Sequence, residues 1–150
     1  PLLTSCVASV TEPNEAVSAR IIFSTTSSVI QRVDSFDFGV AAVGGYYDVD
    51  LYLVNIGPTE ARTIVDKSLS AQSFIFKGGS YPGTGGDCGS ILGINQSCKI
   101  VLRFSAASTA TYEGVITLGY DDIANGAKES SLPVKGKGGT PASLAISDGP

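Results

Sequence analysis

The side chains of this 150-residue chain that could do chemistry are three cysteines and 14 carboxylates. The chain contains no His, which excludes Ser/His/Asp and Cys/His nucleophilic systems and any imidazole metal ligand. Cys88 and Cys98 lie close together in the sequence, and two thiolates without a second cysteine pair make a poor zinc site. We therefore predict a local disulfide between them, which implies a periplasmic or extracellular compartment.

The third cysteine, Cys6, ends the segment Leu2-Leu3-Thr4-Ser5-Cys6. This short pattern resembles the end of a bacterial lipoprotein signal, in which the cysteine becomes the lipid-bearing first residue. Lipidation, pairing with a cysteine of another chain and a lone thiol near a terminus all stay open for Cys6.

Two groups of acidic residues are candidate metal sites. Asp48 and Asp50 are two positions apart on an expected strand, so both point to one face, where Ca²⁺ would need further oxygens. Asp121, Asp122 and Asn125 form a second oxygen-rich group in an expected turn. A solvated strand face and ordinary turn chemistry are favoured over calcium. Nothing in the sequence marks a cleft for a catalytic carboxylate pair, so we expect no enzyme activity, no metal and no cofactor.

Charge and aromatic residues point to protein partners. The net charge of -4 and the pI of about 4.6 argue against nucleic acid, because affinity for phosphates comes mainly from Lys and Arg. Tyr46, Tyr52 and Tyr81 fall on polar-phase or loop positions, where tyrosine suits contact with a protein partner. The ordinary preference of tyrosine for strands explains the same positions equally well.

These side chains are expected on short strands. Apolar and polar residues alternate over residues 47–53 and 99–105, which is typical of half-buried strands. Phe36, Phe38 and Val40 alternate within a third segment, and a hairpin turn is expected at Asn125-Gly126. Further strands are expected over 61–65, 74–76, 112–120 and 128–134.

The whole pattern predicts an all-β fold, an immunoglobulin-like antiparallel β-sandwich of about seven strands with an N-terminal extension. We expect a leader, linker or exchanged strand over residues 1–27, the sandwich over 28–139, and a linker, the start of a further repeat or an exchanged strand over 140–150. A Gly-rich loop over 78–93 would be pinned by the Cys88–Cys98 bridge. No stretch approaches the roughly 18–20 consecutive apolar residues that span a bilayer.

Three ordered groups of short motifs carry a family resemblance. They are Phe36-Asp37-Phe38-Gly39 with the strand end Leu53-Val54-Asn55-Ile56-Gly57, the two cysteine segments 81–89 and 97–105, and Thr111-Tyr112-Glu113-Gly114 with Val134-Lys135-Gly136-Lys137-Gly138. Over residues 30–138 the chain resembles bacterial choice-of-anchor D domains, relatives of the ASH (abnormal spindle and Hydin type) immunoglobulin-like modules. The resemblance implies a non-catalytic domain, repeated on secreted or surface-anchored bacterial proteins, whose two loop cysteines correspond to Cys88 and Cys98.

Three functions are compatible with the predicted fold. The first is a structural or adhesive module on the bacterial cell surface, acting by protein–protein contact. The second is a fibre subunit joined by strand exchange through its terminal segments, for which the candidates are Ile21, Ile22, Phe23, Leu144 and Ile146. The third is a periplasmic lipoprotein that binds a glycan or small ligand under the 78–93 loop. We favour the first.

Overall fold

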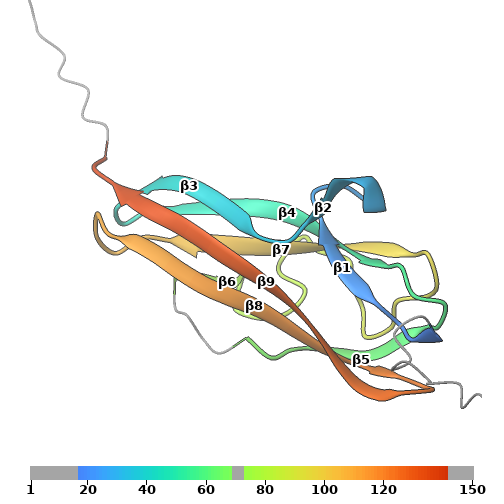
Figure 1. Ribbon diagram of the computed structural model, residues 1–150. Helices are drawn as coiled ribbons and strands as arrows, with labels where there is room; N and C mark the ends of the chain where they lie inside the picture. The colour runs from blue at the N-terminus through green and yellow to red at the C-terminus, as the bar shows by residue number, and fades with distance from the viewer. Residues whose placement is uncertain (1–16, 69–72, 142–150) are drawn as a thin grey trace, which may run out of the picture.

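The computed structural model describes residues 17–68 and 73–141, and it shows two β-sheets packed face to face (Figure 1). The five-stranded sheet has the order β2-β1-β4-β7-β6, and the four-stranded sheet has the order β3-β9-β8-β5. The elements are β1 Ile21–Ser24, the short 3-10 helix η2 Val29–Gln31, β2 Arg32–Val33, β3 Phe36–Ala42, β4 Tyr46–Asn55, β5 Ala61–Asp66, β6 Phe74–Phe76, β7 Ser97–Ser105, β8 Thr111–Asp122 and β9 Gly126–Gly139. The prediction of an all-β sandwich is confirmed. No helix in the described residues is long and apolar enough to cross a membrane.

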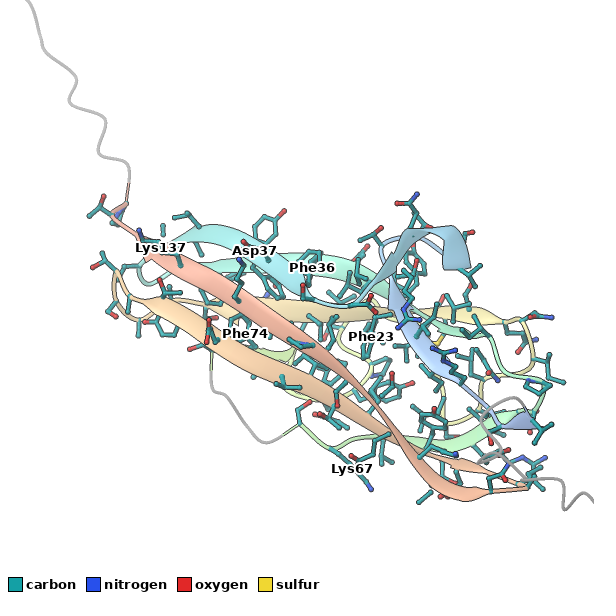
Figure 2. The ribbon with its side chains drawn as sticks, in the orientation of Figure 1. Phe23, Phe36, Asp37, Lys67, Phe74 and Lys137 are labelled. Carbon is teal, nitrogen blue, oxygen red and sulfur yellow. A yellow bond between two sulfur atoms is a disulfide. The ribbon has the colours of Figure 1, made fainter. Side chains whose placement is uncertain are left out.

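The core forms because alternate residues of the central strands point between the sheets. Leu51 of β4 and Leu102 of β7 are completely buried, and both belong to the predicted alternating segments. The aromatic rings of Phe38, Phe74 and Phe104 pack together, with ring centroids 4.9 Å apart for Phe74 and Phe104. Figure 2 labels Phe74 on β6 and Phe23 on β1, and both side chains are buried. The two phenylalanines therefore fill the core from strands far apart in the sequence.

Strand β1 belongs to the sandwich, which starts before the expected boundary at residue 28. β1 lies between β2 and β4 and pairs antiparallel with both. Ile21 and Phe23 point into the core, and Ile22 is buried on the other side of the strand. These three candidates for strand exchange thus complete the sheet of their own chain.

The chain changes sheets between β2 and β3, and this change gives the otherwise antiparallel sandwich one parallel pair of strands. β2 pairs with β1 in one sheet, whereas β3 runs parallel to β9 in the other, starting at Phe36 opposite Val134. A register shift interrupts β3 between Asp37 and Val40. Because a one-residue bulge sends the following side chains to the opposite face, Val40 is 66% exposed instead of buried as its alternation predicted.

The long hairpin of β8 and β9 confirms the turn predicted at Asn125-Gly126. Gly126 has a φ of 75°, a left-handed conformation that glycine adopts without strain. Farther along β9, a Cβ on Gly136 would lie 2.6 Å from the ring of Phe104. Glycine at this position therefore lets the two sheets approach closely.

The segment after β6 confirms the predicted disulfide. Cys88 and Cys98 are bonded, and this joins the Gly-rich loop to the start of β7. The N–H of Lys77 donates to the carbonyl of Val101, and the N–H of Asp87 donates to the carbonyl of Lys99. The loop therefore continues the hydrogen bonding along the edge of β7 beyond the three-residue strand β6.

Candidate functional site

The outer surface of β4 and β7 carries most of the paired charges of the five-stranded sheet. Alternate residues of the two strands point away from the core, and one lysine after β6 reaches the same surface. We call this surface the β4–β7 face, and its members are Tyr46, Asp48, Asp50, Tyr52, Lys77, Lys99 and Arg103.

Arg103 is the centre of the β4–β7 face. Its guanidinium donates to both carboxylate oxygens of the cross-strand neighbour Asp48, over 2.7 and 2.9 Å, and Lys77 lies 3.3 Å from the same carboxylate. The hydrogen bond from Arg103 is the main cause of a pKa of Asp48 below its ordinary value, and the pKa of Arg103 is raised in turn. The guanidinium carbon also stacks 3.7 Å from the ring centroid of Tyr46. The bidentate ion pair of Arg103 with Asp48 thus positions the ring of Tyr46, a residue that is 62% exposed.

The other end of the face pairs Asp50 with Lys99, whose amine lies 3.8 Å away, and Tyr52 stands opposite Lys99 on β4. Both candidate calcium ligands, Asp48 and Asp50, therefore form ion pairs with basic side chains of the protein itself. Residues 17–68 and 73–141 contain no group of three or more His, Cys, Asp or Glu side chains arranged to hold a metal ion.

Tyr81 has a different environment from the other two candidate tyrosines. Its ring meets Phe76 edge to face at 5.6 Å, and its hydroxyl donates to the carbonyl of Gly89 over 2.9 Å. Burial raises the pKa of Tyr81 to about 12. The structure thus brings Tyr46 and Tyr52 onto one face and places Tyr81 within the folded loop.

The acidic turn holds a structural carboxylate. Asp122 is buried, and it accepts hydrogen bonds from the hydroxyl of Thr59 at 2.7 Å and from the amide of Asn125 at 2.7 Å. Its neighbour Asp121 is exposed. The three residues therefore do not present their oxygens to one common point, and the turn joins β8 to the segment before β5.

Sequence reasoning did not single out Arg103, Lys77 and Lys99 as members of the site. Each is ordinary as a surface residue. The register of β4 against β7 brings Lys99 and Arg103 to carboxylates about 50 positions away, and the pairing of the segment after β6 with β7 brings Lys77 to Asp48. Opposite charges at alternating positions on two expected strands were the available signal. Cys6, Leu144 and Ile146 lie outside the described residues.

No protein-family model matches the chain, and no curated protein matches it. The chain resembles the ASH/PapD-like domain 7 of human CEP192, with a TM-score of 0.58, 16% identity, and coverage of 95% of this chain and 99% of that domain. It also resembles part of a family 123 glycoside hydrolase from Clostridium perfringens, with a TM-score of 0.55 and 11% identity, covering 83% of this chain and 27% of the hydrolase.

A third similar structure is the VesB protease of Vibrio cholerae, with a TM-score of 0.53 and 16% identity over 69% of this chain and 30% of the protease. At these identities the likeness concerns the fold alone. The chain has an immunoglobulin-like β-sandwich fold, similar to that of the ASH/PapD-like domain, and the finer resemblance to choice-of-anchor D domains stays a prediction.

Proposed function

We propose that this chain is a non-catalytic protein-interaction module of a bacterial secreted or cell-surface protein, and that it binds its partner through the β4–β7 face. The observation that carries the proposal is the exposed ring of Tyr46 held over Arg103. Tyrosine and arginine are the residue types that contribute most to binding at protein interfaces, and a fixed side chain loses little entropy on binding. Acidic and basic groups beside them supply the polar rim.

The proposed compartment rests on the disulfide. The Cys88–Cys98 bond persists in an oxidising environment and would be reduced in most cytosols. This supports a periplasmic, cell-surface or extracellular protein. Whether a lipid on Cys6 anchors it is a separate prediction, which the mass of the native N-terminal peptide tests.

Photo-crosslinking in the native host tests the binding face. A photoreactive amino acid in place of Tyr52 should yield a crosslinked protein, and Lys99→Asp in the same chain should reduce the yield. The matched control replaces Ile123, which is 68% exposed in the β8–β9 turn. Equal crosslinking from both positions, or none from Tyr52, would contradict binding through this face.

Assembly by strand exchange through the terminal segments is a second candidate, favoured by a free sheet edge. Residues 126–133 of β9 pair with β8 on one side and with no strand of the described residues on the other. The third function, binding of a glycan or small ligand under the 78–93 loop, has no such support, because hydrogen bonds and the disulfide hold this loop against β7.

A further inference from the structure

Half of β9 has an open edge. Strand β3 pairs with β9 only from Val134 onward, so residues 126–133 of β9 pair with β8 on one side and with no strand of the described residues on the other. Figure 1 shows β9 continuing past the end of β3 toward the β8–β9 turn. An edge of this length is a template for another extended segment.

The other sheet edges are protected. β2 has two residues and β6 has three, and short edges pair poorly. β5 and β3 each contain a register shift, and β5 is also bridged to Leu92. The open half of β9 has no bulge, and in the described part of the chain it is protected by Pro133 at its end and by the charged residues Lys128 and Glu129.

The backbone pattern shows which groups of β9 face outward. The N–H and carbonyl of Thr117 bond to Ser68 and Lys67, on the side of β8 away from β9. Its partner Ser131 therefore directs its own N–H and carbonyl to the open edge, because backbone groups alternate sides along a strand. By the same alternation, Ala127 and Glu129 also present their N–H groups there.

A cleft of about 310 Å³ lies beside this edge, between β9 and β1. On the β1 wall, side chains already bond the backbone: the Ser130 hydroxyl donates to the carbonyl of Ile21 over 2.7 Å, and the Tyr120 hydroxyl accepts from the N–H of Ile21. An incoming strand therefore finds backbone partners on β9 and not on β1.

The cleft is also lined by basic side chains that make no ion pair within the described residues. All ten Lys and Arg residues lie within the described residues, and only Arg20, Lys128 and Lys137 make no ion pair there. Arg20 and Lys128 both line the cleft. On β9 the inward residues change from Leu132, which is completely buried and lies beyond the lining of the cleft, through Ser130 to Lys128, so the basic side chain lies toward the β8–β9 turn.

We propose that the open edge of β9 accepts residues 143–148 of a second copy of this chain as an added antiparallel strand. Leu144, Ile146 and Asp148 alternate in that segment and would share one face. The antiparallel direction places Leu144 beside Leu132 and Asp148 beside Lys128, whereas the parallel direction would place the carboxylate beside Leu132 and away from Lys128. The inference rests on the strand-exchange candidate above and names its acceptor.

The chain's own tail does not reach this position. Eight residues separate Leu132 from Thr140, which is about 27 Å along a strand, whereas the four residues from Thr140 to Leu144 span at most about 14 Å. The donor in this register is therefore another copy.

Peptide binding tests the acceptor. A chain ending at Pro141 keeps every described element, and a synthetic peptide of residues 141–150 is the probe. On binding, amide exchange at Ala127, Glu129 and Ser131 should slow, while the N–H groups of Lys128 and Ser130, which face β8, should change little. Protection at β3 or β5 instead, or no binding, would overturn the proposal.

Charge exchange tests the direction of the added strand. Lys128→Asp should weaken peptide binding about tenfold, and a peptide carrying Asp148→Lys should restore it. Lys137→Asp, which alters the other lysine of β9 that makes no ion pair within the described residues (labelled in Figure 2), should leave binding unchanged. Equal loss from both lysine variants, or no restoration, would contradict this register.

Filament assembly of the full chain tests two claims separately, namely that the open edge of β9 is the acceptor and that the chain assembles into fibres by strand exchange. Filaments that form in Lys128→Asp at the same protein concentration as in the parent would contradict the acceptor and leave strand exchange standing. Peptide binding with the predicted exchange pattern, but without filaments of the full chain, would confirm the acceptor and contradict the fibre.

Discussion

Asn55, at the end of β4, is a completely buried side chain with all its hydrogen-bonding groups used. Its carbonyl oxygen accepts from the N–H groups of Arg20 and Gly57, and its amide donates to the carbonyls of Thr59 and Leu92. One amide thus ties the entry to β1, the β4–β5 turn and the disulfide loop together. The sequence predicted a turn after this residue, but its burial depends on three segments that meet only in the fold.

We expect Asn55→Ala to lower the free energy of unfolding by about 3 kcal/mol or more, because it leaves several buried backbone groups without partners. Asn125→Ala, which removes one hydrogen bond at the β8–β9 turn, should cost about 1 kcal/mol. Urea denaturation of both variants measures the difference, and similar losses would contradict the special role of Asn55.

Asp122 makes stability depend on acid pH. Burial alone raises its pKa, but hydrogen bonds from Thr59, Asn125 and backbone N–H groups outweigh burial, so the pKa lies below its ordinary value of 3.8. A carboxyl whose pKa is depressed on folding stabilises the fold above its unfolded pKa, and the contribution disappears as the pH falls through the folded pKa. We expect Asp122→Asn to be less stable than the parent at pH 7 and the difference to shrink below about pH 4. Thermal unfolding across this range measures it, and a constant difference would contradict the explanation.

At the scale of elements, the disulfide loop forms backbone hydrogen bonds with the part of β7 that lies beyond its pairing with the three-residue strand β6. Replacing both Cys88 and Cys98 with Ser should lower the free energy of unfolding by roughly 2.5–3 kcal/mol, the chain-entropy value for so short a loop. Cys6→Ser lies outside the described residues and serves as the control. Denaturation with and without reductant measures the effect, and a parent protein that is insensitive to reductant would argue against a stabilising bridge.

Elements with a clear local pattern were predictable. β4, β7 and the β8–β9 hairpin follow alternating residues and an Asn-Gly turn, which are local signals. The change of sheets between β2 and β3 could not be predicted, because the sequence of an apolar strand does not indicate which sheet the strand joins. The bulge at Gly39, which exposes Val40, likewise interrupts an alternation that looked regular in the sequence.

At the scale of the whole molecule, the sandwich was predictable from many short strands, but its candidate sites were only partly so. Tyr46 and Tyr52 lie on the outward face of β4, as their polar-phase positions predicted, and their contact with a partner stays a prediction. Their ion-pair neighbours, such as Arg103, and the open edge of β9 depend on register and on where β3 stops. Those are properties of strand pairing over long sequence separations, which no local pattern contains.

The place where the sandwich begins gives the clearest test at this scale. A chain that starts at residue 17 keeps β1, whereas one that starts at residue 28 loses Ala19, Ile21 and Phe23 from the core. Burying side chains such as those of Ile21 and Phe23 contributes roughly 1.5–3 kcal/mol each, and β4 would also lose a paired neighbour. The loss is a large fraction of the roughly 5–15 kcal/mol that stabilises an ordinary domain. We expect the first truncation to unfold in urea at the same midpoint as the full chain and the second to unfold at a much lower one. Equal midpoints for the two truncations would show that β1 is an accessory strand, since the core would be complete without it.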